Sequence, residues 1–388
     1  MPTVSSRGRG EPFYAMEVMA SANALAGAGH DVFRLSVGQP STPAPGPVLA
    51  AARAALDSDL LGYTEATGRL DLRQRIARHY GDTYGLDVDA DDVLITTGSS
   101  GAFILATLAA TEPGDAVAMA APGYPGLRNG LIALGCRVHE LEVGPETRYQ
   151  PTVALLDALP EPPRVLIVAS PANPTGTMIE PGVFADVAAW CRAHDCLLMS
   201  DEIYHGIAFG RTPTCAWQYG RDSLIFGSFS KYFSMTGWRL GWTVSPPWLR
   251  DAMTALQGNL AICPPALSQL AAVAAFDPES LAEVDGHVAR YHANRDLVLA
   301  RLPEIGVTRT APPDGAFYIY ADVSHLTNDS LAWCAQVLQD TGVALAPGID
   351  FDPRRGCQYV RISVAGQPEE LDAAFDRLAA YCAGTGAP

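Results

Sequence analysis

The sequence predicts an α/β protein with two domains: a large domain with a mostly parallel, seven-stranded sheet between helices, and a smaller α+β domain formed by both termini. Three observations predict this fold. The chain has 388 residues, 48% of them hydrophobic, whereas a single hydrophobic core stops growing at roughly 250–300 residues. Short apolar runs alternate with helical stretches between residues 92 and 244. A different order of helices and strands begins after residue 276.

Apolar runs with turn residues at their ends predict the strands of the large domain. They are residues 92–98, 116–122, 137–143, 164–171, 196–202, 223–228 and 239–244. Helix-like stretches separate several of them, at residues 101–111, 126–135 and 181–194, the last with proline in its first turn. Strands that alternate with helices indicate a mostly parallel sheet covered on both faces.

The remaining segments predict the small domain. A long amphipathic helix is expected at 277–302 and a closing helix at 367–384, with strands at 315–323, 342–348 and 358–365 between them. A further helix at 15–29 leads into a proline-rich segment at 33–47, which we expect to cross between the domains. The expected division is therefore 1–45 for an N-terminal arm and part of the small domain, 46–276 for the large domain, and 277–388 for the small C-terminal domain.

Composition excludes several classes of function. The net charge of −16 is spread along the chain without a basic stripe, which argues against nucleic acid or an anionic membrane as a partner. The eight cysteines form no CxxC pair and no Cys/His spacing suited to zinc, so we expect no metal site. Neither a signal peptide nor an apolar run of 18 residues is visible, and a cytoplasmic location is expected by default.

Lys231 is the only lysine in the chain, whereas the other 25 of the 26 lysine and arginine residues are arginines. A lysine amine can form a Schiff base with a carbonyl compound, and a guanidinium cannot. The alternative is a solvated surface lysine, but such lysines are numerous in most chains and exchangeable with arginine. The isolation of Lys231 therefore indicates a chemical role.

Two glycine- or proline-rich turns follow predicted strands. Residues 96–103, TTGSSGAF, run from a strand into a helix, where free backbone N–H groups can bind an anion, although such turns are also common connectors. Residues 170–176, SPANPTG, contain two X-Pro bonds. They form either a rigid turn or a fixed backbone that aims the Asn173 amide into a cleft at the carboxyl end of the strand.

A carboxylate ends the next strand, in the stretch MSDEIY at 199–204. Asp201 follows an almost wholly apolar run, and a buried carboxylate usually needs a cationic partner or hydrogen-bond donors. It is either a helix N-cap or a group of a binding site. Tyr204 lies three residues later and could face the same cavity.

Together these stretches resemble the pyridoxal-phosphate-dependent aminotransferases of fold type I, class I/II, most closely the prokaryotic subgroup that includes bacterial aspartate aminotransferases. The resemblance covers nearly the whole chain. The matching stretches, in order, are GQP, GYTEATGRLDLRQRIA, TTGSSGA, APGYP, SPANPTG, SDEIY, SFSKYFSMTGWRLGW, PDGAFYIY, APGIDF and VRISVA.

The resemblance implies roles around the cofactor ring. Lys231 would bind the cofactor aldehyde and later shuttle the proton of the substrate α-carbon. Asp201 would pair with the pyridine nitrogen and favour its protonated form. Asn173 and Tyr204 would hydrogen-bond the phenolic oxygen of the ring, and Tyr124 would stack on the ring face.

The resemblance also implies the residues around the phosphate and the substrate. The phosphate-binding residues would be Ser99, Ser100, Gly101, Ser228 and Arg239, with Tyr63 reaching the phosphate of a neighbouring subunit, which implies a homodimer with shared active sites. Arg361 would bind the substrate α-carboxylate through two parallel hydrogen bonds, with Gly38 and Asn173 beside it. This grip would orient the α C–H bond for cleavage.

Two departures from the family concern the substrate. The turn GSSGA contains no charged residue where the subgroup can have a basic one, and GQPST replaces the family's GEPDF. Arg34 and Arg128 are the nearest candidates to bind an acidic side chain, but neither lies in a matching motif. We therefore expect a neutral or apolar amino acid as the preferred donor.

Two alternatives share the cofactor. A same-fold β-lyase would cleave the C–S bond of a cysteine-like substrate, and it needs the same set of residues. A regulatory domain that binds the cofactor would be fused to a DNA-binding module, but no helix-turn-helix pattern precedes the domain and the chain is acidic. The aminotransferase interpretation is preferred.

Overall fold

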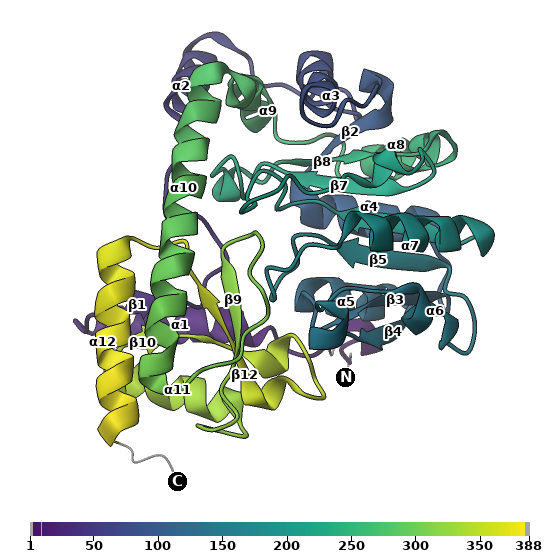
Figure 1. The fold of residues 1–388 in the computed structure, drawn as a ribbon. Helices are drawn as coiled ribbons and strands as arrows, with labels where there is room; N and C mark the ends of the chain where they lie inside the picture. The colour runs from purple at the N-terminus through teal and green to yellow at the C-terminus, as the bar shows by residue number, and fades with distance from the viewer. Residues whose placement is uncertain (1–2, 9, 385–388) are drawn as a thin grey trace.

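A mixed seven-stranded sheet forms the centre of the larger part of the protein in the computed structural model, which describes residues 3–8 and 10–384 (Figure 1). Its strands, in spatial order, are β2 (Val93–Thr96), β8 (Gly241–Val244), β7 (Leu224–Ser228), β6 (Leu197–Asp201), β5 (Val165–Ala169), β3 (Ala116–Ala121) and β4 (Arg137–Glu142). Strand β8 runs antiparallel to both of its neighbours, and the other adjacent pairs are parallel. The predicted seven-stranded, mostly parallel sheet is confirmed.

Helices cover both faces of this sheet. Alternate strand residues point to opposite faces, so that Ile167 and Phe226 pack with one group of helices while Leu166 and Ile225 pack with the other. The first group is α4 (Gly98–Ala110), α5 (Pro125–Leu134) and α8 (Pro247–Leu260); the second is α2 (Gly46–Ser58), α3 (Leu70–Tyr84), α6 (Val153–Asp157), α7 (Pro181–Ala193) and α9 (Ala266–Ala272).

A three-stranded antiparallel sheet forms the second hydrophobic core, with β11 (Ala346–Pro347), β12 (Tyr359–Ser363) and β9 (Tyr318–Asp322) in that order. The helices α10 (Pro278–Arg301), α11 (Ser330–Thr341) and α12 (Pro368–Gly384) pack on this part of the chain (Figure 1). Short 3-10 helices complete the connections, at Ser6–Gly8, Ala90–Asp92, Pro145–Thr147, Ala216–Gln218, Thr236–Trp238, Val273–Phe276, Leu302–Ile305, Gly348–Asp350 and Gly356–Gln358.

The N-terminal segments lie against this second core. Helix α1 (Tyr14–Gly27) packs on α11, and β1 (Phe33–Arg34) pairs in parallel with β10 (Val343–Ala344). These contacts support placing the arm with the small domain. The domain bounds stay a prediction, and residues 1–2, 9 and 385–388 of that division lie outside the described residues.

The stretch 342–348 differs from the expectation of one continuous strand. It forms two short strands, because β10 pairs with β1 whereas β11 pairs with β12 in another sheet. Each half pairs with a strand from a distant part of the chain, and a local sequence pattern does not determine such pairing. This break brings the N-terminal arm next to β12, which carries Arg361.

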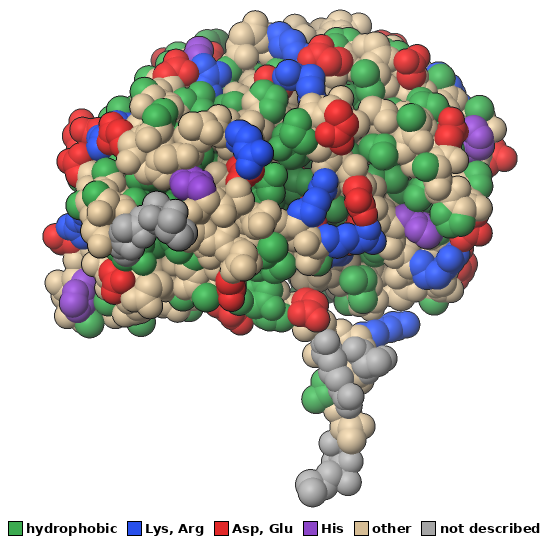
Figure 2. All heavy atoms as spheres, turned by 60° about the horizontal axis from the view of Figure 1, so that its bottom comes forward, with side chains coloured by type: hydrophobic (Ala, Val, Ile, Leu, Met, Phe, Trp, Pro, Cys, Tyr) green, Lys and Arg blue, Asp and Glu red, His purple; other side chains and the backbone are tan. Residues whose placement is uncertain are grey.

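The surface shows no large patch of one charge on the face drawn in Figure 2, where acidic and basic side chains lie next to one another among hydrophobic ones. Within the described part of the chain, no helix is both long and apolar enough to cross a membrane.

Candidate active site

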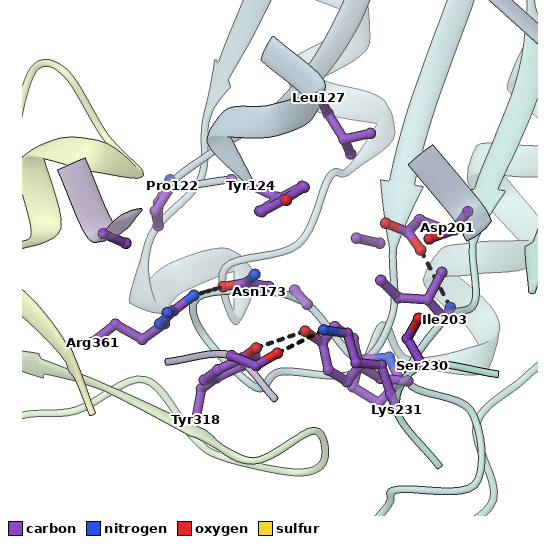
Figure 3. Close-up of a pocket in the computed structure, with 18 of the residues that line it drawn as sticks. Pro122, Tyr124, Leu127, Asn173, Asp201, Ile203, Ser230, Lys231, Tyr318 and Arg361 are labelled. Atoms are coloured by element: carbon purple, nitrogen blue, oxygen red, sulfur yellow. Dashed lines mark hydrogen bonds between the residues drawn. The ribbon is translucent and has the colours of Figure 1, made fainter. Parts of the chain in front are cut away.

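A cavity of about 440 Å³ lies where the carboxyl ends of the parallel strands meet the N-terminal arm and β12 (Figure 3). Its volume is within the usual range for small-molecule sites. Predicted site residues that line it are Gly38, Ser99, Ser100, Tyr124, Asn173, Asp201, Tyr204, Lys231, Arg239 and Arg361. These residues are more than 300 positions apart in the sequence, from Gly38 to Arg361, and the fold brings them to one cavity.

Three predicted residues do not line this cavity. Gly101 lies in the first turn of α4, one position after Ser100. Ser228 ends β7, and its hydroxyl accepts a hydrogen bond from the backbone N–H of Ser230 at 3.1 Å; Ser230 itself lines the cavity. The Tyr63 side chain is 83% exposed on the surface.

Lys231 follows β7, and its amine is inside the cavity wall. Nζ donates a hydrogen bond to the Gly38 carbonyl oxygen at 2.6 Å and lies 5.7 Å from the centre of the Tyr204 ring. Burial, together with the cationic Arg361 and Arg239, lowers the pKa of Lys231 to about 8, while Asp201 acts in the opposite direction. A fraction of the amine is therefore neutral, and nucleophilic, near physiological pH.

Asp201 ends β6 and is only 9% exposed. Its Oδ1 accepts a hydrogen bond from the backbone N–H of Ile203 at 3.2 Å. Burial raises the pKa of Asp201 to about 6, while the Ile203 bond and Lys231 act in the opposite direction. A carboxylate in this position is costly to ionise by itself, so a cation inside the cavity would gain from pairing with it.

His205 holds the segment that carries Asn173 against the end of β6. Its Nε2 donates to the Ser170 carbonyl oxygen at 3.0 Å, and because a carbonyl only accepts, this contact assigns the ring proton to Nε2. Nδ1 then accepts from the Tyr84 hydroxyl at 2.7 Å. Burial lowers the pKa of His205 to about 3, so the ring is neutral. Ser170 also donates its N–H to the Asp201 carbonyl oxygen at 3.2 Å.

Arg361 is a buried cation on β12, only 3% exposed. Its guanidinium carbon lies 4.4 Å from the ring centre of Tyr318 and 4.7 Å from that of Phe351. Nη1 donates to the Asn173 side-chain oxygen at 2.8 Å and Nη2 to the Ser36 carbonyl oxygen at 2.6 Å, whereas Nε is buried without a hydrogen-bond partner among the described residues. A carboxylate beside this group would supply both a counter-charge and an acceptor.

The Arg239 side chain contacts the beginning of α4. Gly98 has a φ of +70°, and a Cβ atom there would lie 2.5 Å from Nη2 of Arg239. Glycine is therefore required both for the backbone conformation and for the close approach of the guanidinium. The first N–H groups of a helix lack intrahelical partners, so Ser99, Ser100 and Arg239 together have the chemistry to bind an anion.

The lining of the cavity also contains apolar side chains. Among them are Phe13, Met16, Met19 and Leu127, and the Phe13 ring packs edge-on against Tyr124 with centroids 5.7 Å apart. The two arginines considered from the sequence are absent from this lining. They bind elsewhere: Arg34 donates to Asn23 at 3.2 Å, and Arg128 donates to the Asp350 carbonyl oxygen at 3.0 Å.

Several lining residues were not predicted from the sequence. Ser230, Thr236 and Tyr318 lie within matched stretches, so a scan of each stretch for side chains on the same face as the predicted residues could have found them. Phe13, Met16 and Met19 had no such signal, because an amphipathic helix at this place reads as ordinary packing. Among the described residues, no group of His, Cys, Asp or Glu could hold a metal ion.

Comparison with known proteins agrees with this geometry. The model of the family "Aminotransferase class I and II" matches residues 30–378. The chain is 53% identical to the valine–pyruvate aminotransferase of Mycobacterium tuberculosis over 372 residues, which is 95% of this chain and 96% of the relative.

Solved structures are similar over almost the whole length. An aminotransferase from Mycobacterium tuberculosis has a TM-score of 0.97 at 52% identity and covers 99% of this chain and 100% of its own. The aspartate aminotransferase from Thermus thermophilus with maleate has a TM-score of 0.92 at 30% identity, covering 98% and 100%. The chain therefore belongs to the class I and II aminotransferases, and it is an enzyme that transfers an amino group between an amino acid and a 2-oxo acid.

Proposed function

We propose that this enzyme uses pyridoxal 5′-phosphate to transfer the amino group of a neutral or apolar L-amino acid, with valine as the first candidate, to pyruvate in a ping-pong reaction. The observation that carries the proposal is a single cavity with a nucleophilic amine and a buried carboxylate at one end, a buried arginine at the other, and apolar side chains in its lining (Figure 3). When bound, the cofactor supplies an aldehyde that condenses with amines and a protonated ring that withdraws electrons.

The residues present fit the three functional groups of this cofactor. The aldehyde would meet Lys231, the only lysine of the chain. The ring nitrogen would meet Asp201, which lacks a cationic hydrogen-bond partner among the described residues and has its pKa raised by burial. The phosphate would lie at the anion site, where Gly98 leaves room for Arg239.

Each side chain at this end has a distinct task. Asp201 holds the ring nitrogen protonated, and Asn173 and Tyr204 donate hydrogen bonds to the phenolic oxygen. Tyr124 packs on the ring face. The phosphate is held by Ser99, Ser100, Gly101, Ser228 and Arg239, and the position of Ser230 in the cavity wall supports adding its hydroxyl to this set.

Lys231 also moves the proton. With the amino acid bound, Nζ would accept the proton from the substrate α-carbon and would be the group that gives it back, as a general base and then a general acid. Its lowered pKa, about 8, favours this role because the amine must be neutral when it accepts the proton. Arg361 and Gly38 would hold the substrate carboxylate and so orient the α C–H bond for cleavage.

The substrate class follows from the apolar wall. The Phe13, Met16, Met19 and Leu127 side chains contain no group that could pair with a charged side chain, and an unpaired carboxylate there would lose its hydration without compensation. The name of the valine–pyruvate aminotransferase relative supports valine and pyruvate as the reacting pair.

The active enzyme is proposed to be a homodimer. Tyr63 is highly exposed, and large apolar side chains near it in sequence, Leu60 and Leu70, are 94% and 51% exposed. A shared site would bring Tyr63 to the partner's phosphate and would cover these apolar groups. The cytoplasmic location stays a prediction.

A panel of amino acids with pyruvate or 2-oxoglutarate tests the reaction. Alanine should form from pyruvate with valine as donor, and aspartate should be a poor donor. Each reaction is repeated without an oxo acid while ammonia is measured. Ammonia and pyruvate released from a cysteine-like substrate without an acceptor would favour the β-lyase alternative and contradict the proposed transamination.

A further inference from the structure

Tyr318 lies between the two ends of the cavity, and the proposed contacts with cofactor and substrate do not involve it. It comes from β9, is 1% exposed, and in Figure 3 its side chain lies between Arg361 and Lys231. Its hydroxyl is 2.7 Å from the hydroxyl of Tyr204, and its ring lies under the Arg361 guanidinium at 4.4 Å. It thus contacts one residue from each end of the cavity.

Gly38 completes this set of contacts. A Cβ atom on Gly38 would overlap the Tyr318 hydroxyl, so the absence of a side chain lets the hydroxyl approach the backbone. The carbonyl of the same Gly38 accepts the hydrogen bond of Lys231 at 2.6 Å. The position of the Tyr318 hydroxyl is therefore limited on one side by Gly38 and on another by Tyr204.

The direction of the hydrogen bond between the Tyr318 and Tyr204 hydroxyls decides whether Tyr204 can donate its proton to another group. In the free protein either oxygen can be the donor. A phenol has one proton, so if Tyr204 donates to an oxygen in the cavity, its own oxygen can only accept, and Tyr318 must then be the donor. A hydroxyl that accepts a hydrogen bond becomes a stronger donor itself.

We propose that Tyr318 is a positioning residue that directs the Tyr204 proton toward the phenolic oxygen of the cofactor and, with its ring, keeps the Arg361 guanidinium in the plane that grips the substrate carboxylate. This inference rests on the proposed function, because it takes the cofactor oxygen as the acceptor for Tyr204. The hydroxyl and the ring of Tyr318 have separate tasks, which makes them separable by mutation.

The hydroxyl is tested with Tyr318→Phe, which keeps the ring. Tyr320→Phe is the matched control: Tyr320 is on the same strand, also 1% exposed, stacks on Tyr359, and its buried hydroxyl has no partner among the described residues. The pH at which the absorption of the bound cofactor changes should rise by about half a unit in Tyr318→Phe, because a weaker donor stabilises the phenolate less. Tyr320→Phe should leave it unchanged.

The ring is tested with Tyr318→Leu, which loses both features. Tyr318→Phe should lower kcat by roughly threefold with little change in the KM of the donor, whereas Tyr318→Leu should also raise this KM by about tenfold as the guanidinium loses its stacking surface. A KM that rises equally in both variants would overturn the separate role of the ring.

A double-mutant cycle with Gly38→Ala tests the close approach. In the wild-type background the new methyl group collides with the Tyr318 hydroxyl, whereas in Tyr318→Phe the nearest atom it meets is a ring carbon at 3.3 Å. Gly38→Ala should therefore cost less cofactor affinity in Tyr318→Phe than in wild type. If the losses of cofactor affinity in the two single variants add up in the double variant, Gly38 and Tyr318 do not limit each other's position.

The outcomes separate this inference from the proposed function. If wild type binds the cofactor through Lys231 while Tyr318→Phe and Tyr320→Phe give the same absorption midpoint, the role of Tyr318 is overturned and the proposed function stands. If wild type binds no cofactor, the proposed function fails first. Equal melting temperatures of the two Phe variants show that any difference between them is not a folding defect.

Discussion

The two walls of the cavity are built in different ways. The sheet wall consists of Ser99, Asp201, Lys231 and Arg239, which come from the end of a strand, from the segment between β7 and β8, or from the first turn of α4. The terminal wall consists of Phe13, Met16, Met19, Tyr318 and Arg361, which come from the N-terminal arm and from two strands of the other sheet. Polar and ionisable groups dominate the first, and apolar surface with one buried cation dominates the second.

This difference suggests a division of tasks: the sheet wall carries out the reaction, and the terminal wall selects the substrate. The register of parallel strands sets the sheet wall: Ala169 pairs with Asp201, and Asp201 with Phe226, so the chain leaves both strands at the same edge. These groups would act on any amino acid. The terminal wall would meet the carboxylate and side chain of the substrate, and its residues can change without disturbing the sheet.

The largest effect is expected in the sheet wall from Lys231→Arg. The substitution keeps the positive charge but removes the only amine that can form a Schiff base within the chain. Turnover should fall by roughly 10⁴-fold or more, because both the covalent and the proton-transfer roles are lost. Borohydride should no longer fix the cofactor to any internal side chain, as judged by peptide mass spectrometry. A Lys231→Arg variant that still transaminates would contradict the catalytic role of Lys231.

A smaller loss is expected in the terminal wall from Arg361→Lys. A lysine cannot make two parallel hydrogen bonds or stack in the same way between Tyr318 and Phe351. The kcat/KM for the amino-acid donor should fall by about 100-fold. The absorption of the bound cofactor should stay as in wild type, because the sheet wall is intact. A changed absorption with normal donor kinetics would reverse the assignment of the two walls.

A change of selectivity is expected from Met19→Ala. The shorter side chain enlarges the apolar end of the cavity, so kcat/KM for leucine or phenylalanine relative to valine should rise by roughly tenfold. Glu17→Ala is the matched control, because Glu17 is on the same helix, is exposed and does not line the cavity. If both variants have the donor preference of wild type, α1 does not contact the substrate side chain.

The smallest effect is a pH dependence of cofactor uptake by the cofactor-free enzyme. The pKa of Lys231 is lowered to about 8, and only the neutral amine attacks an aldehyde. The rate of covalent uptake should therefore rise by about tenfold from pH 7 to pH 9 and then level off. Stopped-flow absorbance measures it. A rate that still increases beyond pH 10 would mean that burial does not depress the pKa of this amine.

Much of the fold was predictable because its signals are local. The seven strands of the large sheet are apolar runs that end at turn residues, and each was placed within a few residues of its observed bounds. Helices α2, α3, α6, α8, α9 and α11 were not predicted. Helix α6 has only five residues, too few for a periodic pattern, and the apolar positions of the others lie among alanines, glycines or charged residues that give weaker patterns.

The site was predictable only where residues carry unusual chemistry. Lys231 was recognised because it is alone, and Asp201 because a carboxylate ends an apolar run. Tyr318 and Ser230 are ordinary residue types, and only their positions beside Tyr204 and the anion site make them relevant. Arg128 was considered for the substrate, but the structure directs it to the Asp350 carbonyl oxygen.

By itself the sequence determined the class of fold, the family resemblance and the residues whose chemical groups have no substitute, since these depend on local patterns and on functional groups. Only the tertiary structure decided which side chains share the cavity, that burial brings the pKa values of Lys231 and Asp201 to about 8 and about 6, and that apolar side chains of α1 line the same cavity as the buried Arg361. The physical reason is that burial and contact arise between segments far apart in the chain, and their strength depends on distances that no stretch of sequence contains.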